Sequence, residues 1–116
     1  MRYLALIYAP VGAAPAYGTP EFGPYMAAYQ AASAVYAREG VMRGGEALQP
    51  TSTATTVRVR GGKTQTMDGP FAETKEQLGG FYLFDCANLD DAVKYAAMIP
   101  TAAHGSVEIR PIMELG

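Results

Sequence analysis

The sequence predicts a single α+β domain over residues 1–116, a ferredoxin-like sandwich with an inserted β-hairpin. Three observations predict it. A chain of 116 residues that is 49% hydrophobic can bury one core. Strand-like and helix-like segments follow one another as strand, helix, strand, hairpin, loop, strand, helix and strand, which gives two βαβ-like halves. A Gly-Gly pair between two β-rich runs indicates the hairpin between those halves.

The first half is predicted to hold a buried strand followed by a helix. Residues 3–9 are apolar on both alternations, which is typical of a strand in the middle of a sheet with both faces covered. A loop rich in proline and glycine then leads to the helix, for which Thr19 or Gly23 is the expected N-terminal cap. Tyrosine and alanine recur at helical spacing over residues 25–39, and Gly40 is the expected stop.

The other strands are predicted from short β-rich runs bounded by turn residues. They cover residues 41–48, 55–60, 63–67, 81–86 and 107–112. Before the last strand, Asn88 is the expected cap of a second helix, and Asp90 and Asp91 complement the positive end of that helix. Pro100 is expected to end it. Its expected apolar stripe consists of Leu89, Ala92, Val93 and Ala96.

Both helices are expected on one face of the sheet, because βαβ crossovers are right-handed. The opposite face would then expose large apolar side chains from residues 3–9 and 81–84. The apolar patches that a monomer exposes rarely exceed roughly a few hundred Å². We therefore expect a homodimer in which two sheets pack face to face.

Composition narrows the possible partners and compartments. Nine basic and eleven acidic residues, spread along the chain, leave no basic stripe, so neither nucleic acid nor a membrane surface is an expected partner. Cys86 is the only cysteine, which excludes an intrachain disulfide framework and favours the reducing cytoplasm. The apolar run at the N-terminus is shorter than a membrane span and alternates like a strand rather than a signal peptide.

Three motifs in this sequence resemble those of a known family. They are GGEALQP at residues 44–50, DGPFAETKE at residues 68–76 and HGSVEIRP at residues 104–111. Over essentially the whole chain they resemble the DGPF-domain branch of the YCII-related family. The resemblance implies a dimeric α/β barrel of ferredoxin-like subunits with a cleft near the subunit interface. It also implies relatives that are similar to a dehydrochlorinase of aromatic degradation, and relatives that lie beside extracytoplasmic-function sigma factors.

The chain departs from the wider family at one point. The resemblance implies a His-Asp pair with its histidine in or near the first helix. Here the only histidine is His104, near the last strand, and the first helix offers Tyr25, Tyr29 and Tyr36 instead. The acid/base pair of the wider family is therefore not transferred to this sequence.

Three polar residues of the motifs are the candidate catalytic groups. Asp68 is either a general base at a strand end or an Asx-type turn residue that accepts backbone N–H groups. His104 is either a proton-transfer group, because imidazole titrates near neutral pH, or a capping and turn element before a strand. Glu46 is costly to bury unpaired, so it is either a site carboxylate or half of an ion pair with Arg43 or Lys75.

Three further residues are the candidate substrate-binding groups. Lys75 could bind an anionic substrate, although a solvated charged loop is the favoured interpretation. Tyr29 could line an aromatic pocket or belong to the core, and Phe71 lies in the same polar loop as Asp68. We expect no metal and no cofactor, because the sequence shows no ligand spacing, phosphate-cradling glycine loop, dinucleotide fingerprint or nucleophile elbow.

The leading functional hypothesis is a dimer that binds a small organic molecule, as a cofactor-independent lyase, isomerase or dehydrochlorinase that uses His104, Asp68 and Glu46 for acid/base catalysis. The alternative is a non-catalytic ligand-binding or regulatory partner in a pathway linked to an extracytoplasmic-function sigma factor. A third possibility, a cofactor-free monooxygenase on the same dimeric barrel, depends on analogy of fold alone.

Overall fold

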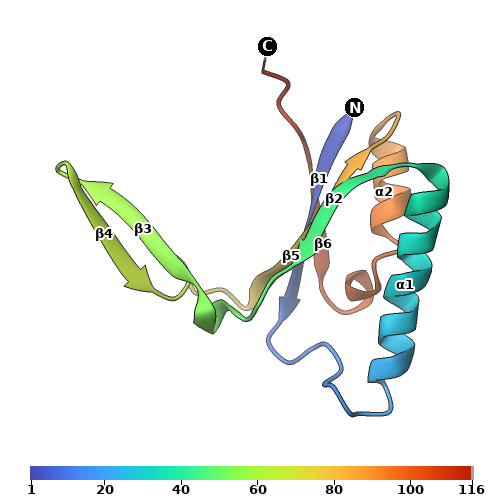
Figure 1. Ribbon diagram of the computed structural model, residues 1–116, viewed down its shortest axis with the longest axis horizontal. Coiled ribbons are helices and arrows are strands. Elements are labelled where there is room, and N and C mark those ends of the chain that lie inside the picture. Colours follow the sequence, from blue (N-terminus) through green and yellow to red (C-terminus); the bar gives the residue numbers. More distant parts are fainter. Residues whose placement is uncertain (116) are drawn as a thin grey trace.

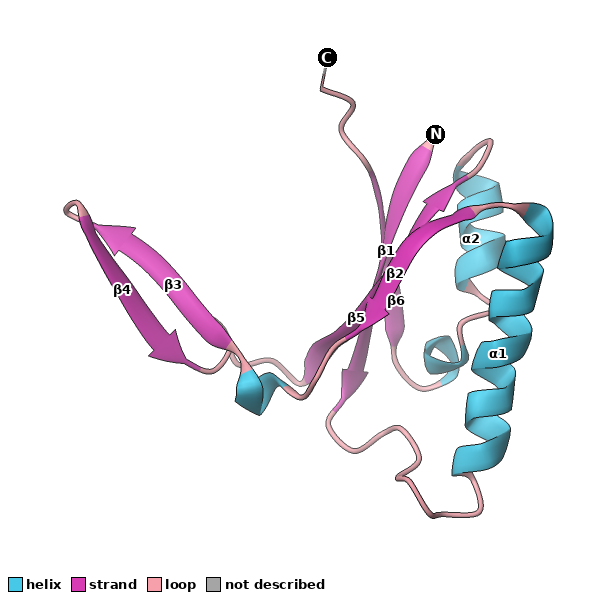
Figure 2. Cartoon of the chain, viewed as in Figure 1, coloured by secondary structure: helices cyan, strands magenta, loops and turns pink. Residues whose placement is uncertain are grey.

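The computed structural model describes residues 1–115, which form a mixed α+β structure with two antiparallel sheets and two α-helices (Figures 1 and 2). The main elements are β1 (Arg2–Pro10), α1 (Phe22–Glu39), β2 (Met42–Ala47), β3 (Thr55–Arg60), β4 (Lys63–Asp68), β5 (Glu76–Asp85), α2 (Leu89–Ala96) and β6 (Ser106–Pro111). Two 3-10 helices, η1 (Thr51–Thr53) and η2 (Pro100–Ala103), precede β3 and β6. The larger sheet has the order β2-β5-β1-β6, and the smaller sheet is the β3-β4 hairpin. The strands of residues 1–115 close no barrel within one chain.

Strand β1 lies in the interior of the larger sheet, as its apolar composition predicted. It pairs with β5 on one side and β6 on the other, both antiparallel. Alternate side chains, Tyr3, Ala5 and Ile7, are buried on the face that the helices cover. Leu4 and Leu6 point to the other face and are only half-buried, so this chain covers one face of the strand and leaves the second open.

Both helices pack on the same face of the larger sheet, as the handedness argument predicted (Figure 1). The core between them is aromatic. The hydroxyl of Tyr36 donates a hydrogen bond of 2.7 Å to the carbonyl oxygen of Tyr95, which ties α1 to α2. The rings of Tyr36 and Phe84 meet edge to face at 5.0 Å, an arrangement that the ring quadrupoles favour. Burial raises the pKa of Tyr36, so its phenol stays neutral in the core.

The predicted N-terminal caps of the first helix are wrong. Helix α1 begins at Phe22, after Glu21, and no side chain caps it. The hydroxyl of Thr19 instead donates to the carbonyl oxygen of Ala16 in the loop, at 2.7 Å. Pro24 falls within the first turn, where a backbone N–H has no intrahelical partner, so the proline does not interrupt the helix. The predicted stop is confirmed, because Gly40 adopts a left-handed φ of 66°.

The second helix confirms its predicted cap and corrects its predicted apolar stripe. The side-chain oxygen of Asn88 accepts a hydrogen bond of 2.9 Å from the backbone N–H of Asp91. Leu89 and Val93 of the expected stripe are each 51% exposed. The buried face consists of Ala92, Tyr95 and Ala96. Two alanines four residues apart let the helix backbone approach the sheet closely, while the larger aliphatic side chains face away from it.

The hairpin is confirmed and stands apart from the rest of the molecule. Gly61 and Gly62 both have positive φ, 56° and 76°, as the two-residue turn of a twisted hairpin requires. The strands on either side pair only with each other, from Thr55 opposite Asp68 to Arg60 opposite Lys63. Figures 1 and 2 show this hairpin projecting from the side of the larger sheet that is opposite the helices. We call residues 55–68 the arm.

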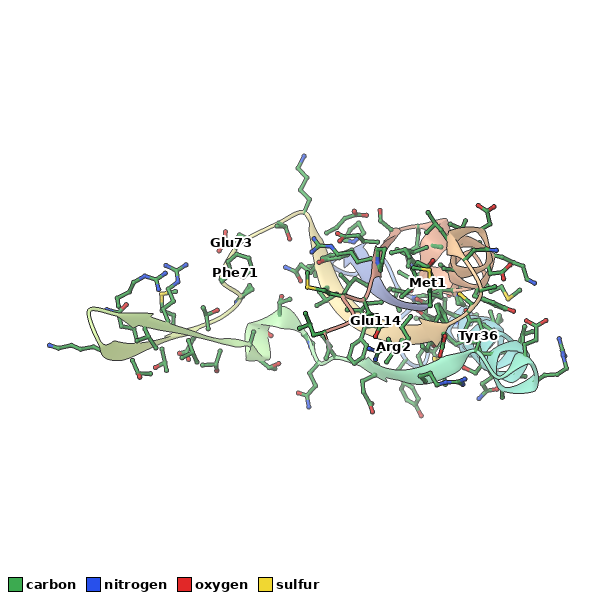
Figure 3. The ribbon with its side chains drawn as sticks, turned by 90° about the horizontal axis from the view of Figure 1, so that it is seen from above. Met1, Arg2, Tyr36, Phe71, Glu73 and Glu114 are labelled. Atoms are coloured by element: carbon green, nitrogen blue, oxygen red, sulfur yellow. The ribbon has the colours of Figure 1, made fainter. Side chains whose placement is uncertain are left out.

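Strand β5 is longer than predicted. It begins at Glu76 rather than Phe81, because residues 76–78 pair with the end of β1 after a register shift that leaves Gly79 as the extra residue. The segment 69–75 that joins the arm to β5 contains no helical turn, so the possible helical grouping of Glu73, Lys75 and Glu76 does not form. Figure 3 shows Phe71 and Glu73 on this connecting segment.

Candidate functional site

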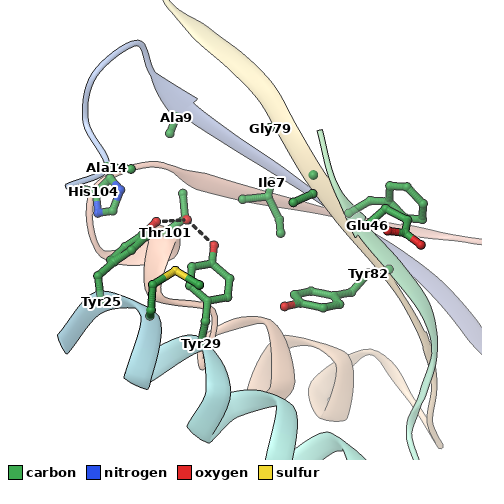
Figure 4. Close-up of a pocket in the computed structure, with 15 residues that line it drawn as sticks. Ile7, Ala9, Ala14, Tyr25, Tyr29, Glu46, Gly79, Tyr82, Thr101 and His104 are labelled. Carbon is green, nitrogen blue, oxygen red and sulfur yellow. Dashed lines mark hydrogen bonds between the residues drawn. The ribbon is translucent and has the colours of Figure 1, made fainter. Parts of the chain in front are cut away.

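A pocket of about 450 Å³ opens between the first turns of α1, the sheet and η2 (Figure 4). Its apolar walls come from Ile7 and Ala9 of β1 and Met26 of α1. Its polar groups come from residues far apart in the sequence, from α1, β5 and the segment around η2. A mostly apolar cavity with a few convergent polar groups is the usual form of a small-molecule site.

Three hydroxyl groups form a cluster in this pocket. Tyr25 and Tyr29 stand one turn apart on α1, so both rings face the same neighbour. Their hydroxyls lie 2.8 Å and 2.5 Å from the Oγ1 atom of Thr101 on η2. Thr101 is 5% exposed, and η2 is anchored beneath it by the buried side chain of Ile99. We call Tyr25, Tyr29 and Thr101 the hydroxyl cluster.

The hydroxyl cluster has one proton more than its internal bonds use. Each hydroxyl supplies one O–H donor and can accept as well, so the three groups offer three protons. The two bonds to Thr101 consume two of them, whichever atoms donate. Within residues 1–115, the two bonds to Thr101 are the only ones that these hydroxyls make at hydrogen-bond distance, although, besides burial, the neighbouring Tyr25 hydroxyl also raises the pKa of Tyr29. One O–H therefore remains to donate to a ligand in the pocket.

Two phenols of the pocket, Tyr29 and Tyr82, are donors rather than bases at neutral pH. Burial is the largest influence on Tyr29 and raises its pKa to about 12, against the opposing effect of the hydrogen bond with Thr101. Burial also raises the pKa of Tyr82, which enters the pocket from β5. Both groups therefore keep their protons throughout the physiological range.

His104 lies at one end of the pocket, as Figure 4 shows. It follows η2 directly, and its backbone N–H donates to the carbonyl oxygen of Thr101 at 3.1 Å, so the predicted turn role is real. Its ring centroid is 5.9 Å from that of Tyr25. Gly105 holds this segment against β1 so closely that a Cβ atom there would lie 2.2 Å from the carbonyl oxygen of Tyr8. The imidazole is thus both a turn element and a pocket residue.

Glu46 contributes its backbone to the pocket but not its carboxylate. It pairs with Phe81 across β2 and β5, whereas the next residue, Tyr82, faces the pocket. Opposite residues in antiparallel strands share a face, so Glu46 points to the open side of the sheet, as Figure 4 shows. The ion pair considered for it does not form either: the Nε atom of Arg43 is 4.0 Å from Asp85, and within residues 1–115 Lys75 makes no ion pair.

Asp68 lies on the arm, outside this pocket. The chain bends after it at Gly69, with a positive φ of 93°, as a turn requires. Backbone groups fix the bend, because the N–H of Gly69 donates to Ala54 at 2.7 Å and the hydroxyl of Thr56 donates to the carbonyl oxygen of Gly69 at 2.9 Å. In the described part of the chain, the Asp68 carboxylate accepts no hydrogen bond, so the expected Asx bond is absent.

One chain therefore does not bring the three candidate catalytic residues together. His104 lines the pocket, Glu46 points to the opposite face of the sheet and Asp68 belongs to the arm. The candidate substrate-binding residues divide in the same way. Tyr29 is in the pocket, Lys75 is exposed, and Phe71 is 75% exposed.

A second hollow of about 510 Å³ lies at the base of the arm. Phe71 lines it together with Pro50, Pro70 and Leu78. Tyr8 also lines it, and this residue lies on the sheet face opposite to the buried Ile7. The lining residues include no cationic side chain and no carboxylate. This hollow belongs to the open side of the sheet rather than to the pocket with the hydroxyl cluster.

Sequence reasoning missed Thr101 and Tyr82, whereas Tyr25 and Tyr29 were candidates for either an aromatic pocket or the core. The spacing of Tyr25 and Tyr29 signals that they share a neighbour, but nothing local identifies that neighbour as Thr101. A buried threonine, 76 residues from Tyr25, becomes visible only when η2 packs under α1.

Two features are absent from the part of the chain that the structure describes. No group of three or more His, Cys, Asp or Glu residues among residues 1–115 is arranged to hold a metal ion. None of the helices in the same range has the length and apolar character to cross a membrane.

Comparison with known proteins identifies relatives of this chain. The model of the YCII-related domain matches residues 1–116. An uncharacterised protein of Rhizobium meliloti (strain 1021) is 41% identical over 114 residues, which cover 97% of this chain and 92% of that protein. This similarity extends over the whole pocket, the arm and the segment that joins them.

Proposed function

Because the chain belongs to the YCII-related family, and a family name alone assigns no reaction, we propose its function from the pocket. We propose that the protein binds a small, uncharged organic molecule with a hydrogen-bond acceptor, such as a carbonyl group, against the hydroxyl cluster. The single observation that supports this proposal is the spare O–H of Tyr25, Tyr29 and Thr101 inside an apolar cavity.

The charge inventory of the pocket supports an uncharged ligand. No lysine or arginine lines it, so an anionic ligand would lose its hydration without gaining a permanently cationic partner. The carboxylate of Glu46 points away, so a cationic ligand would also lack a partner. Apolar contacts with Ile7 and Met26 then supply affinity, and the hydroxyl cluster supplies orientation.

His104 gives the pocket a group that can exchange a proton with the ligand. It is the only imidazole in the chain, and Tyr29 in the same pocket holds its proton. A ligand whose acceptor is polarised by the hydroxyl cluster would present more acidic protons to His104. We propose lyase, isomerase or dehydrochlorinase chemistry of this cofactor-independent kind, with His104 as the acid/base group.

Binding can be tested with matched aromatic probes. The probe 4-hydroxyacetophenone has a carbonyl acceptor, 4-ethylphenol lacks it, and 4-hydroxybenzoate replaces it with an anion. Titrations followed by NMR should show the ketone binding at least about tenfold more tightly than the other two, the difference expected for one desolvated hydrogen bond. Equal affinities for the ketone and 4-ethylphenol would contradict a role of the spare O–H.

Variants of the hydroxyl cluster sharpen the same test. Thr101→Val keeps the shape of the side chain but removes the hydroxyl to which both tyrosines bond. Tyr29→Phe removes one of the two phenol hydroxyls. Each variant still has an unused O–H but no longer holds it in the same position, so both should weaken ketone binding by about tenfold and leave 4-ethylphenol unchanged. Tyr8→Phe, at the second hollow, is the matched control and should bind both probes like the original protein. His104→Gln separates binding from catalysis, because it should retain ketone affinity and abolish turnover of any substrate that is found.

The finer features of fold and assembly are part of the same proposal. The strand order β2-β5-β1-β6 and the helices on one face support a ferredoxin-like sandwich. The open face, with Leu4, Leu6, Phe81 and Leu83, supports a homodimer that closes an α/β barrel. We place the chain in the DGPF-domain branch on the motifs at residues 68–76, and in the cytoplasm on its single cysteine.

A second candidate is a non-catalytic ligand-binding or regulatory protein linked to an extracytoplasmic-function sigma factor. The separation of His104, Glu46 and Asp68 favours it, because a lone imidazole without a nearby carboxylate has no group to orient it. Purification of the protein with and without the ketone probe, followed by pull-down of a neighbouring sigma factor, would test the regulatory role. A sigma factor that never co-purifies in either state would count against this candidate.

A further inference from the structure

The arm is an isolated structure with two different faces. Its strands pair only with each other, and of its strand residues only Thr56 is even half-buried. One face consists of the β-branched residues Thr55, Val57, Val59, Thr64 and Thr66, with Asp68 at its base opposite Thr55. The other face includes the cations Arg58, Arg60 and Lys63. A two-stranded hairpin in water is marginally stable at best, so this arm lacks the packing partner that such a hairpin needs.

The shape of the chain leaves room for a partner beside the arm. The radius of gyration is 16.2 Å, whereas a compact chain of this length would have one of about 13 Å. The arm extends on the side of the sheet that the helices do not cover (Figures 1 and 3). A strand of six residues spans about 20 Å, and packed sheets lie about 10 Å apart, so the arm is long enough to pass a second sheet on the open face.

The charge distribution points to a second copy of this chain as that partner. The arm, residues 55–68, has three cations and one carboxylate, so its net charge is +2. The rest of the chain, residues 1–54 and 69–116, which we call the body, has six cations and ten carboxylates, so its net charge is −4. Opposite net charges attract two copies with the arm of each directed at the body of the other. A polyanion such as DNA would be attracted by the arm but repelled by the larger body.

We propose that the arm docks on a second copy of this chain, with its β-branched face on the body of that copy. The inference depends on the homodimer of the proposed function and goes beyond it: the arm becomes part of the interface rather than a free extension. Two such arms flank the paired sheets on opposite sides. Val57 and Val59, each 60% exposed in one chain, become buried in the pair.

The test combines sedimentation with hydrogen exchange over a range of protein concentrations. In the original protein, the amides of residues 55–68 should gain protection as the chain passes from monomer to dimer. The double variant Val57→Asp and Val59→Asp should raise the midpoint of dissociation at least about tenfold, because it buries two carboxylates without partners. Thr64→Asp with Thr66→Asp, on the same face, should have the same effect.

Matched controls and contrary outcomes keep this proposal separate from the function of the pocket. Arg58→Thr with Gln65→Thr changes the opposite face and should shift the midpoint by less than about threefold in high salt, where net charge is screened. If the protein dimerises but the arm amides stay unprotected, the docking of the arm is contradicted and the homodimer is not. The same holds if neither pair of aspartate substitutions changes the midpoint of dimer dissociation. A protein that stays monomeric contradicts both the docking of the arm and the homodimer. Ketone titration of the same sample still tests ligand binding in the pocket. Protection that appears only on addition of duplex DNA overturns the second copy as partner.

Discussion

The body and the arm of this protein differ in how far their apolar side chains are buried. In the body, aromatic side chains from α1, α2 and β5 meet around Tyr36, which is completely buried. In the arm, valines and threonines of equal β propensity remain exposed, because no second layer covers them. The hairpin turn and the core are equally well defined in the sequence. The comparison teaches that local sequence specifies an element, whereas packing against another layer determines how much that element stabilises the fold.

The largest contrast should come from truncation of one apolar side chain in each region. Phe84→Ala removes a side chain with no exposed surface and should cost about 3–5 kcal/mol of the free energy of unfolding. Val57→Ala should cost less than about 0.5 kcal/mol when the protein is dilute and monomeric, because Val57 is largely exposed. Urea denaturation of the two variants measures both values. A large cost of Val57→Ala at low concentration would mean that the arm already packs within one chain.

A second contrast lies in two glycines that border the pocket region. Gly105→Ala places a Cβ atom against the backbone of Tyr8 and should cost about 1–3 kcal/mol, with weaker ketone binding because the N–H of Gly105 bonds to Thr101 and its movement would displace that residue. Gly79→Ala is the matched control, because a Cβ atom there meets no atom within 4 Å. Thermal unfolding and ketone titration check both variants. Equal stability of the two would show that the segment after η2 is looser than its contacts indicate.

Alkaline pH should loosen the body and spare the arm. The fold raises the pKa of Tyr29 to about 12, compared with about 10 for tyrosine in an unfolded chain. Stability from the neutral phenol is therefore complete below about pH 10 and is lost as pH rises toward 12, because the unfolded chain ionises first. Tyr29→Phe should flatten the fall of Tm in this range. Tyr17→Phe, at an 89% exposed residue, should not change it. A fall of Tm as steep in Tyr29→Phe as in the original protein would contradict this assignment.

The smallest effect on global stability should come from the turn of the arm. Gly61→Ala forces a side chain into a left-handed φ of 56° and should destabilise the hairpin locally by about 1–2 kcal/mol. The Tm of the monomer should change little, whereas the amides of residues 55–68 should exchange faster. Gly61→Asn is the control, because asparagine tolerates this φ and Asn-Gly favours the same turn. If Gly61→Ala lowered both the Tm and the protection of the arm amides, the two regions would unfold together.

Much of the fold could be predicted from the sequence because its signals act over a few residues. The Gly61-Gly62 turn, the stop at Gly40 and the cap at Asn88 all appear where they were predicted. The failures occur where a local rule had competitors. Thr19 was an acceptable cap but bonds within its loop, and Leu89 and Val93 fitted an apolar stripe that smaller alanines fill better.

The candidate site could be predicted only in part, since it is assembled from distant segments. His104 and Tyr29 were recognised as unusual residues, and both line the pocket. Glu46 was recognised from its motif, yet its register opposite Phe81 turns its carboxylate to the other face. A shift of one residue in strand pairing would reverse that orientation, and no single segment of sequence fixes it.

The sequence by itself determined the order of elements, the turns and the family of this protein, because these depend on neighbouring residues and on motifs that are contiguous. The tertiary structure alone decided that Thr101 joins Tyr25 and Tyr29, that Glu46 leaves the pocket and that the arm stands free of its own body. The physical reason is that strand register and layer packing bring together residues separated by most of the chain. Their energies depend on which surfaces meet, and that information is not local.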